Sequence, residues 1–268
     1  MITSTSNQQM KDLSALLKKS KERKVNKVFV VEGTKMVAEA PRKWLRKVYV
    51  SESYEKNPEN QAMLKEFSKE TSVYRFSVET VSDSVFKSVS DTQTPQGIMA
   101  VVAMPEYSLE QLVQGEKTHL LILESVQDPG NLGTMLRTGE GAGITGVIMN
   151  KTTVDLFNPK TIRSTMGSIY RMPFYVTEDL PGTLETLKKQ GVALYAAHLK
   201  GQRSYDEEDY TGACGFLIGN EGNGLSDEIA NQADIYIKIP MEGQVESLNA
   251  AISATLLMYE ANRQRRHK

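Results

Sequence analysis

Apolar and polar positions over the first hundred residues follow two periods. Short β-branched runs predict strands, and stretches with an apolar residue every three or four positions predict helices. We expect helices at 12–24, 33–40 and 59–70, and strands at 27–31, 47–50 and 97–103. This order predicts a small α/β domain over 1–104. Met104 and Pro105 interrupt the pattern, so we place a linker at 105–117.

From residue 118 to residue 268 we expect a second α/β domain, because short apolar runs alternate regularly with amphipathic stretches. The expected strands are 119–124, 146–149, 173–176, 192–197, 215–218 and 235–239, and the expected helices are 131–142, 159–167, 181–190, 226–232 and 247–262. Strands separated by helices predict a parallel sheet that is covered on both faces. Ligands of such sheets bind in loops beyond the carboxyl ends of the strands.

Composition narrows the class of protein. Apolar residues make up 40% and charged residues 24% of the chain, as in soluble globular proteins, and no apolar run approaches the roughly 20 residues of a membrane span. The first residues lack the apolar core of an export signal. The single cysteine, Cys214, excludes an internal disulfide and a cysteine-based metal cluster. We therefore expect a cytoplasmic protein without a metal ion.

The charge is distributed unevenly along the chain. Residues 1–50 contain twelve Lys or Arg and four Asp or Glu, a net charge of +8, whereas the whole chain has a net charge of −1. A basic first segment suggests contact with a polyanion, most simply nucleic acid. A solvated helix face would give the same pattern.

One apparent nucleotide-binding motif is better interpreted as a turn. Residues 141–146 fit G-x-G-x-x-G, but that motif needs a strand before the glycines and a helix after them. Here a helix precedes Gly141 and Gly143 and a strand follows, so these glycines are expected to end the helix.

Three loops that each follow a strand and open a helix carry candidate chemistry. In the first, Asn131 is placed as a helix cap and Arg137 follows nearly two turns later. In the second, GNEGNG, the carboxylate of Glu221 stands among glycines that allow close approach to a ligand. In the third, Ser247 is a candidate cap for a helix whose apolar stripe of Leu248, Ile252 and Leu256 is expected in the core. Each is an ordinary turn by itself, but together they describe one composite site.

The segments NLGTMLRTGEGAG (131–143), FLIGNEGNGLS (216–226) and IPMEGQVESLNAAISATLLMYE (239–260) resemble, in order and spacing, the three motifs of the SpoU/TrmH RNA 2′-O-ribose methyltransferases of the SPOUT superfamily. The resemblance implies a parallel-sheet domain with a deep trefoil knot, and a homodimer formed through it. The earlier VFVVEGTKMVAEA and SDTQTPQGIMAVVA resemble the family's substrate-binding domain, a small fold similar to ribosomal RNA-binding proteins.

The resemblance also implies roles for individual residues. S-adenosylmethionine would contact Gly219, Ile239 and Leu248, with Ala197, His198 and Leu199 near its adenosine, and residues 220–222 would separate it from the RNA. The contacts at Gly219, Ile239 and Leu248 follow from motif position, and Asn220 is counted with them as a cofactor-binding residue. Methyl transfer needs alignment and then loss of the hydroxyl proton.

By motif position Arg137 is placed at the reacting ribose hydroxyl, with Asn131, Glu221, Ser247 and Asn249 around it. A guanidinium stays protonated at neutral pH. We therefore expect Arg137 to hold the adjacent phosphate and stabilise the developing alkoxide, while another group accepts the proton.

The expected function is 2′-O-methylation of ribosomal RNA, because the N-terminal extension suits a folded RNA target. Transfer RNA is the alternative substrate, and a catalytically silent RNA-binding or assembly protein is the alternative from another class. A small-molecule methyltransferase would leave the basic first fifty residues without a role.

Overall fold

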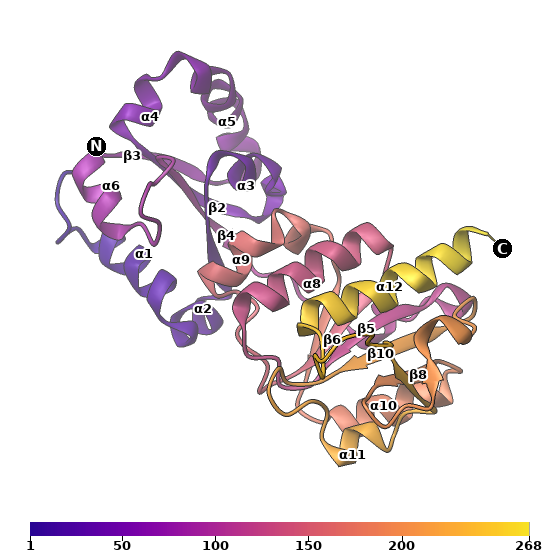
Figure 1. The fold of residues 1–268 in the computed structure, drawn as a ribbon. Helices are drawn as coiled ribbons and strands as arrows, with labels where there is room; N and C mark the ends of the chain where they lie inside the picture. The colour runs from indigo at the N-terminus through magenta and orange to yellow at the C-terminus, as the bar shows by residue number, and fades with distance from the viewer. Residues whose placement is uncertain (268) are drawn as a thin grey trace. The chain divides into compact units, whose positions relative to one another are not determined.

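The structure, a computed structural model, describes residues 1–267 and contains two compact units. One consists of 1–105 and 157–170, and the other of 106–156 and 171–268. Each has its own β-sheet with helices on both faces (Figure 1), which confirms the α/β class. Lys268, the last residue of the expected second domain, lies outside the described residues.

The N-terminal unit is built on a mixed four-stranded sheet with the order β1-β4-β2-β3. β4 pairs antiparallel with both β1 and β2, and β3 pairs parallel with β2. The strands are β1 (Val28–Glu32), β2 (Leu45–Ser51), β3 (Ser77–Val81) and β4 (Ile98–Ala103).

Helices cover both faces of this sheet and bury its apolar side chains. They are α1 (Gln8–Lys18), α2 (Ser20–Asn26), α3 (Thr34–Glu39), α4 (Glu52–Lys56), α5 (Gln61–Tyr74), α6 (Asp83–Val89) and α9 (Pro159–Thr165). On one face, α1 and α6 pack around a cluster that includes Leu13, Phe86 and Met99. α9 packs against β1, and the nearby rings of Phe29 and Phe157 lie 4.9 Å apart.

Two predictions for this unit were incomplete. The helix expected at 12–24 is two helices, because Lys19 adopts an extended backbone conformation, with φ −120° and ψ 113°. β3 and α6 were not predicted at all. β3 is a short edge strand whose side chains, apart from Val81, are not fully buried, so its sequence shows little of the apolar pattern of a strand.

The second unit contains a seven-stranded sheet in which every recorded pairing is parallel, as predicted. The order is β7-β6-β5-β10-β8-β11-β9. The strands are β5 (His119–Leu123), β6 (Gly146–Asn150), β7 (Phe174–Thr177), β8 (Ala193–Ala197), β9 (Arg203–Ser204), β10 (Cys214–Ile218) and β11 (Ile235–Lys238). The central strands β5 and β10 are buried along their whole length.

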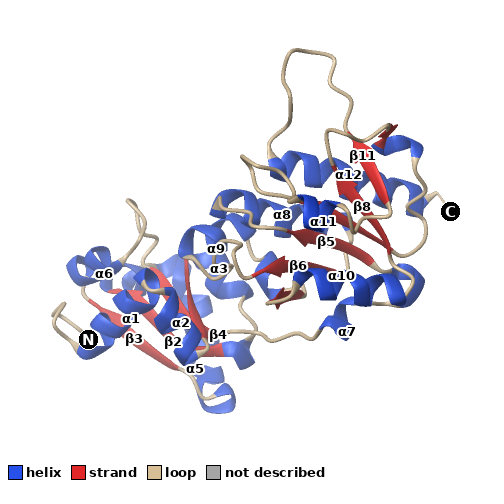
Figure 2. Ribbon diagram, turned by 90° about the horizontal axis from the view of Figure 1, so that it is seen from below, coloured by secondary structure: helices blue, strands red, loops and turns tan. Residues whose placement is uncertain are grey.

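α8 and α12 cover one face of this sheet, and α10 and α11 cover the other (Figures 1 and 2). The helices of the unit are α7 (Leu109–Leu112), α8 (Pro129–Ala142), α10 (Leu180–Lys189), α11 (Asp227–Ala230) and α12 (Ala250–Arg266). Gly143 ends α8 with a left-handed φ of 72°, so the glycines of 141–146 do form a helix cap and turn. Within residues 1–267, no helix is long and apolar enough to cross a membrane.

Small residues let α8 and α12 approach closely. Ala251 and Ala254 are buried, and a Cβ atom at Gly139 would lie 2.6 Å from the Ile144 side chain and 3.5 Å from the sulfur of Met258. The predicted core stripe of Leu248, Ile252 and Leu256 is wrong, since Ile252 is 50% exposed. α12 instead buries the face that carries Ala251, Ala254, Ala261, Leu257 and Met258.

Candidate active site at the carboxyl edge of the parallel sheet

The loop after β10 is a tight hairpin that requires glycine. The backbone N–H groups of Asn220 and Gly224 donate to each other's carbonyl oxygens, at 3.0 and 2.9 Å. A Cβ atom on Gly219 would lie 2.1 Å from the carbonyl carbon of Gly224, and Gly224 itself has a φ of +70°. No side chain can be placed at Gly219 without moving this backbone.

Asn220 ties this hairpin to the loop after β5. Its side-chain nitrogen donates to the Ser125 carbonyl at 2.9 Å, while its oxygen accepts from the backbone N–H groups of Gly222 and Asn223. Ser125 has a φ of +56°, which is rare for a residue with a Cβ atom. Its N–H donates to the side chain of Asn150 at 2.9 Å. We did not single out Ser125 or Asn150 from the sequence; their only signal was a position directly after a strand.

Glu221 joins the hairpin after β10 to the segment that follows β5, by accepting hydrogen bonds from that segment. Its Oε1 accepts from the Asp128 backbone N–H and the Asn131 side-chain amide, both at 3.0 Å, and its Oε2 accepts from the Gln127 N–H at 2.9 Å. Partial burial raises the pKa of Glu221, but these hydrogen bonds outweigh it, and the pKa lies below its ordinary value of 4.5. The side chain is therefore a carboxylate at neutral pH, and its oxygens are occupied by donors.

Asn131 links Glu221 to the third loop. Its side-chain oxygen accepts from the side-chain nitrogen of Asn249 at 3.0 Å. Two cap assignments need correction, because Asp128, not Asn131, caps α8, and Asn249, not Ser247, caps α12. Asn131 lies inside the first turn of α8, where its side chain is free to bridge Glu221 and Asn249. All three predicted loops thus meet in one hydrogen-bonded chain.

Arg137 and Ser247 do not join this chain of hydrogen bonds. Both are exposed, and neither side chain has a hydrogen bond or ion pair within residues 1–267. Arg137 lies nearly two helical turns after Asn131, which separates its side chain from Glu221. The structure presents an unpaired cation on the same helix that carries Asn131.

The predicted cofactor-contacting residues follow three neighbouring strands. β10, β8 and β11 are adjacent and parallel, so Gly219, Ala197 and Ile239 lie at the same edge of the sheet. Ala197, Ile239 and Leu248 are half-buried, whereas Leu199 is 75% exposed. The ring of His198 stacks on Tyr236, with the ring centres 5.1 Å apart, so a structural role accounts for this histidine.

This edge has the features of a small-ligand site. Half-buried apolar side chains adjoin backbone that Gly219 keeps free of side-chain bulk, and polar groups of three loops lie beside them. No three His, Cys, Asp or Glu side chains of residues 1–267 are grouped in a way that could hold a metal ion.

Family profiles match both parts of the chain. The profile described as SpoU rRNA Methylase family matches residues 118–259, and the one described as MRM3-like substrate binding domain matches residues 7–100. The first of these matches contains the residues of the three loops, from Ser125 to Asn249.

Similar proteins extend the match over nearly the whole chain. The 23S rRNA (guanosine(2553)-2′-O)-methyltransferase RlmP of Bacillus subtilis is 36% identical over 96% of this chain and 97% of its own length. An rRNA methyltransferase structure from Sinorhizobium meliloti superposes with a TM-score of 0.87 at 30% identity, covering 98% of this chain and 96% of that one.

A third similar structure contains a bound ligand. It is the SpoU methyltransferase AviRb from Streptomyces viridochromogenes in complex with the cofactor AdoMet, with a TM-score of 0.85, 25% identity, and coverage of 98% of this chain and 100% of that one. Profile, sequence and structure agree, and the chain belongs to the SpoU rRNA methylase family.

Proposed function

We propose that the protein methylates a ribose 2′-oxygen of ribosomal RNA with Arg137 at the reacting hydroxyl. Membership of the SpoU family makes the chain an S-adenosylmethionine-dependent RNA 2′-O-ribose methyltransferase. The observation that carries the proposed site is the hydrogen-bonded chain Glu221–Asn131–Asn249, which joins all three loops beside the strand ends.

The carboxyl edge of β8, β10 and β11 is the proposed cofactor site. S-adenosylmethionine supplies an electrophilic methyl group on a sulfonium. Gly219, Ile239 and Leu248 would hold it through backbone and apolar contacts, with Ala197, His198 and Leu199 on the adenosine side and Asn220 fixing the hairpin. The exposure of Leu199 leaves its side chain available for such a contact.

Arg137 would bind the RNA at the reacting nucleotide. An exposed guanidinium with no protein partner within residues 1–267 is available to a phosphate, which it can contact through two parallel hydrogen bonds. Held there, it would also stabilise negative charge on the 2′-oxygen as the proton leaves. The proton itself goes to another acceptor, because the guanidinium is already protonated.

The other predicted catalytic residues have positioning roles in this account. Glu221 is occupied by three donors and acts by fixing residues 127–131. The hydrogen bond between Asn131 and Asn249 joins these residues to the start of α12. Ser247 is exposed two residues before Asn249, and in this account it would contact the ribose or its phosphate.

Ribosomal RNA is the preferred substrate over transfer RNA, because the related Bacillus subtilis protein acts on 23S rRNA and aligns over both units. A silent RNA-binding protein of the same fold is disfavoured by the intact Glu221–Asn131–Asn249 chain.

The substrate-binding match at 7–100, together with the basic residues 1–50, supports RNA contact by the N-terminal unit, for which we propose a ribosomal-protein-like role. We place the reaction in the cytoplasm, where ribosomal RNA is available.

A knot and a homodimer are part of the proposal. The chain leaves β11 near one edge of the sheet, yet α12 packs on α8 and on the central strand β10, as a threaded C-terminus requires. Ile252 is 50% and Tyr259 is 44% exposed. These two side chains are seven residues apart on α12 and share one face, which offers an apolar surface to a second copy.

The test is transfer of labelled methyl from S-adenosylmethionine to total RNA from a strain without this gene, with nuclease mapping of the product. We expect label on one ribose of ribosomal RNA, and a loss of at least about 100-fold in Arg137→Ala. Label on transfer RNA would overturn the substrate assignment. A near-normal rate and pH profile in Arg137→Lys would overturn the role of Arg137.

A further inference from the structure

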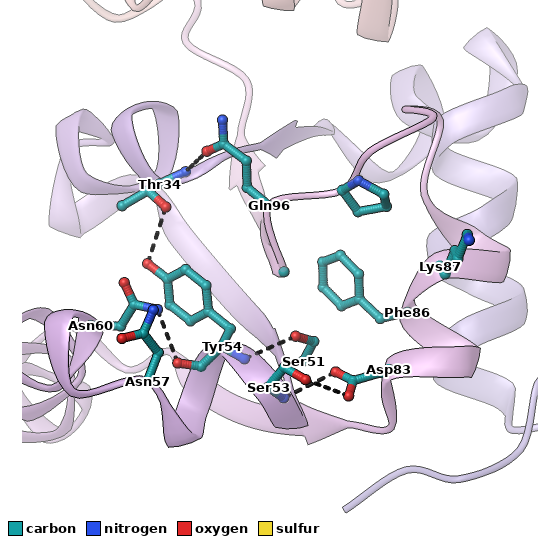
Figure 3. Close-up of a pocket in the computed structure, with 12 residues that line it drawn as sticks. Thr34, Ser51, Ser53, Tyr54, Asn57, Asn60, Asp83, Phe86, Lys87 and Gln96 are labelled. Atoms are coloured by element: carbon teal, nitrogen blue, oxygen red, sulfur yellow. Dashed lines mark hydrogen bonds between the residues drawn. The ribbon is translucent and has the colours of Figure 1, made fainter.

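The N-terminal unit contains a pocket of about 520 Å³, formed entirely by residues between 34 and 97 (Figure 3). It lies between α4, α6 and the segment that leads into β4, and its lining contains none of the residues placed in the catalytic site. Its volume is within the range of about 300–1,000 Å³ that is usual for small-ligand sites. We infer that this pocket takes one unpaired base of the RNA substrate. This inference rests on the proposal that the substrate is RNA.

Specific contacts hold the pocket open in one shape. The side-chain oxygen of Gln96 accepts from the Thr34 N–H at 2.8 Å, and the Tyr54 hydroxyl donates to the Thr34 hydroxyl at 3.2 Å (Figure 3). Gly97 has a φ of +83°, and a Cβ atom there would lie 2.7 Å from the Ser51 hydroxyl. The walls are therefore formed before any ligand arrives, which reduces the entropic cost of binding.

The lining suits a base, which has a flat apolar face and a polar edge. Tyr54 and Phe86 provide an apolar floor, against which a base can rest. The side-chain nitrogen of Asn57 and the side-chain oxygen of Asn60 form no hydrogen bond with residues 1–267. These two neutral groups, a donor and an acceptor, are available to the edge of a base.

A carboxylate in the pocket lining argues against a phosphate beside it. Both oxygens of Asp83 accept from Ser53, at 3.0 Å from the backbone N–H and 2.6 Å from the hydroxyl. These hydrogen bonds lower the pKa of Asp83, so it is a carboxylate at neutral pH. A phosphate in the pocket would be repelled by this charge, whereas a neutral base would not.

Lysines for the phosphates lie on either side of α6, beginning with one in the pocket lining. Lys87 is exposed at the rim. Beyond it, Ser88 and Val89 line a second groove of about 470 Å³ that also contains Lys11, Lys18 and Lys19. An RNA strand that crosses α6 would keep its phosphates on these lysines while one base enters the pocket.

The experiment measures binding of two fluorescent probes to the full chain, a short mixed-sequence single-stranded RNA and the same sequence as a duplex. We expect Phe86→Leu to weaken binding of the single strand about 3- to 10-fold and to leave duplex binding unchanged, because only an unpaired base can enter. Lys87→Ala should weaken both probes about equally, because it contacts a phosphate. Lys69→Ala, which removes a charge from α5 that is also exposed, is the matched control.

An equal effect of Phe86→Leu on both probes, or no effect on either, would overturn the inference. Melting temperatures of all variants exclude simple unfolding. Methyl transfer is measured in the same preparations, which separates the two proposals. If Phe86→Leu loses single-strand binding selectively but the wild type transfers no methyl group, the proposed function alone is refuted. If Phe86→Leu binds both probes like the wild type and methyl transfer is normal, the pocket alone is refuted.

Discussion

At the scale of single residues, the site depends on a carboxylate that organises rather than reacts. Glu221 accepts three hydrogen bonds from residues 127, 128 and 131, and these contacts lower its pKa in spite of partial burial. A group in this state is a poor proton acceptor near neutral pH. Its contribution is to hold the loop after β5 and the start of α8 in register with the hairpin at 219–224.

The lowered pKa of Glu221 predicts a specific dependence of stability on pH. Because its pKa is lower in the folded than in the unfolded chain, Glu221 stabilises the fold above pH 4.5, and this contribution is lost as pH falls through the folded pKa. The melting temperature of Glu221→Gln should therefore fall less than that of the wild type between neutral pH and about pH 3. Glu246→Gln, at an exposed carboxylate of the 239–249 segment, should follow the wild-type curve.

A negative charge at position 131 should slow methyl transfer more than removal of the Asn131 side chain does. Asp at this position would put a carboxylate 3.0 Å from Glu221 Oε1 in place of the amide donor. We expect Asn131→Asp to transfer methyl more slowly than Asn131→Ala at neutral pH, with a loss of at least about 100-fold. Its rate relative to Asn131→Ala should recover at lower pH, where one carboxylate of the pair takes up a proton. Equal rates across the pH range would contradict this account.

At the scale of elements, each site loop follows a parallel strand and leads toward a helix, and the glycines of the hairpin after β10 have separate functions. At Gly219 the backbone of residue 224 occupies the space of a side chain. At Gly222, three residues along, the nearest atom to an added Cβ would be the Asn220 side-chain oxygen at 3.5 Å, an ordinary contact. The hairpin tolerates a side chain at one glycine and not at the other.

This difference provides a matched pair of variants. Gly219→Ala must displace the hairpin, so we expect loss of measurable S-adenosylmethionine binding by calorimetry and a lower melting temperature. Gly222→Ala adds the same methyl group without a clash and should retain cofactor binding within about 3-fold. Binding of the cofactor by Gly219→Ala at wild-type affinity would show that the hairpin is not part of its site.

Much of the fold was predictable because apolar periodicity reports buried elements. β5 and β10 are buried along their length, and their sequences predict strands without ambiguity. β3 was missed because it is a largely polar edge strand. The exposure of Ile252 was missed because a helical stripe shows which residues share a face, not which face is buried.

The meeting of the three candidate loops was also predictable, but its details were not. Parallel strands bring their carboxyl ends to one edge, so Asn131, Glu221 and Asn249 were expected to lie close together. The caps were misassigned because Asp128 and Asn131, like Ser247 and Asn249, are residue types that cap helices equally well. Ser125 carries no local signal of its left-handed backbone, which depends on contacts with Asn150 and Asn220.

At the scale of the whole molecule, the chain has separate surfaces for separate tasks. One unit matches a substrate-binding profile and contains the pocket near Tyr54, while the other contains the methyltransferase motifs. α12 has a third surface, formed by Ile252 and Tyr259 on the side away from the buried Ala254. This is the surface that we propose is covered by a second copy of the chain.

The proposed dimer makes a direct prediction for α12. Ile252→Asp places a charge in an apolar interface, so light scattering should show a monomer where the wild type is a dimer. Val245→Asp introduces the same charge at a residue that is 61% exposed but lies outside α12, and it should remain dimeric. A dimeric Ile252→Asp protein, or a monomeric wild type, would contradict the assignment.

The central claim is that this chain methylates one ribose of ribosomal RNA through Arg137 and the Glu221–Asn131–Asn249 chain. Its most direct test is mass spectrometry of digested ribosomal RNA from a strain lacking the gene, complemented with the wild type or with Arg137→Ala. The account predicts one 2′-O-methylated nucleoside that is absent in the deletion strain, restored by the wild type and not restored by the variant. Identical methylation in all of these strains would contradict it.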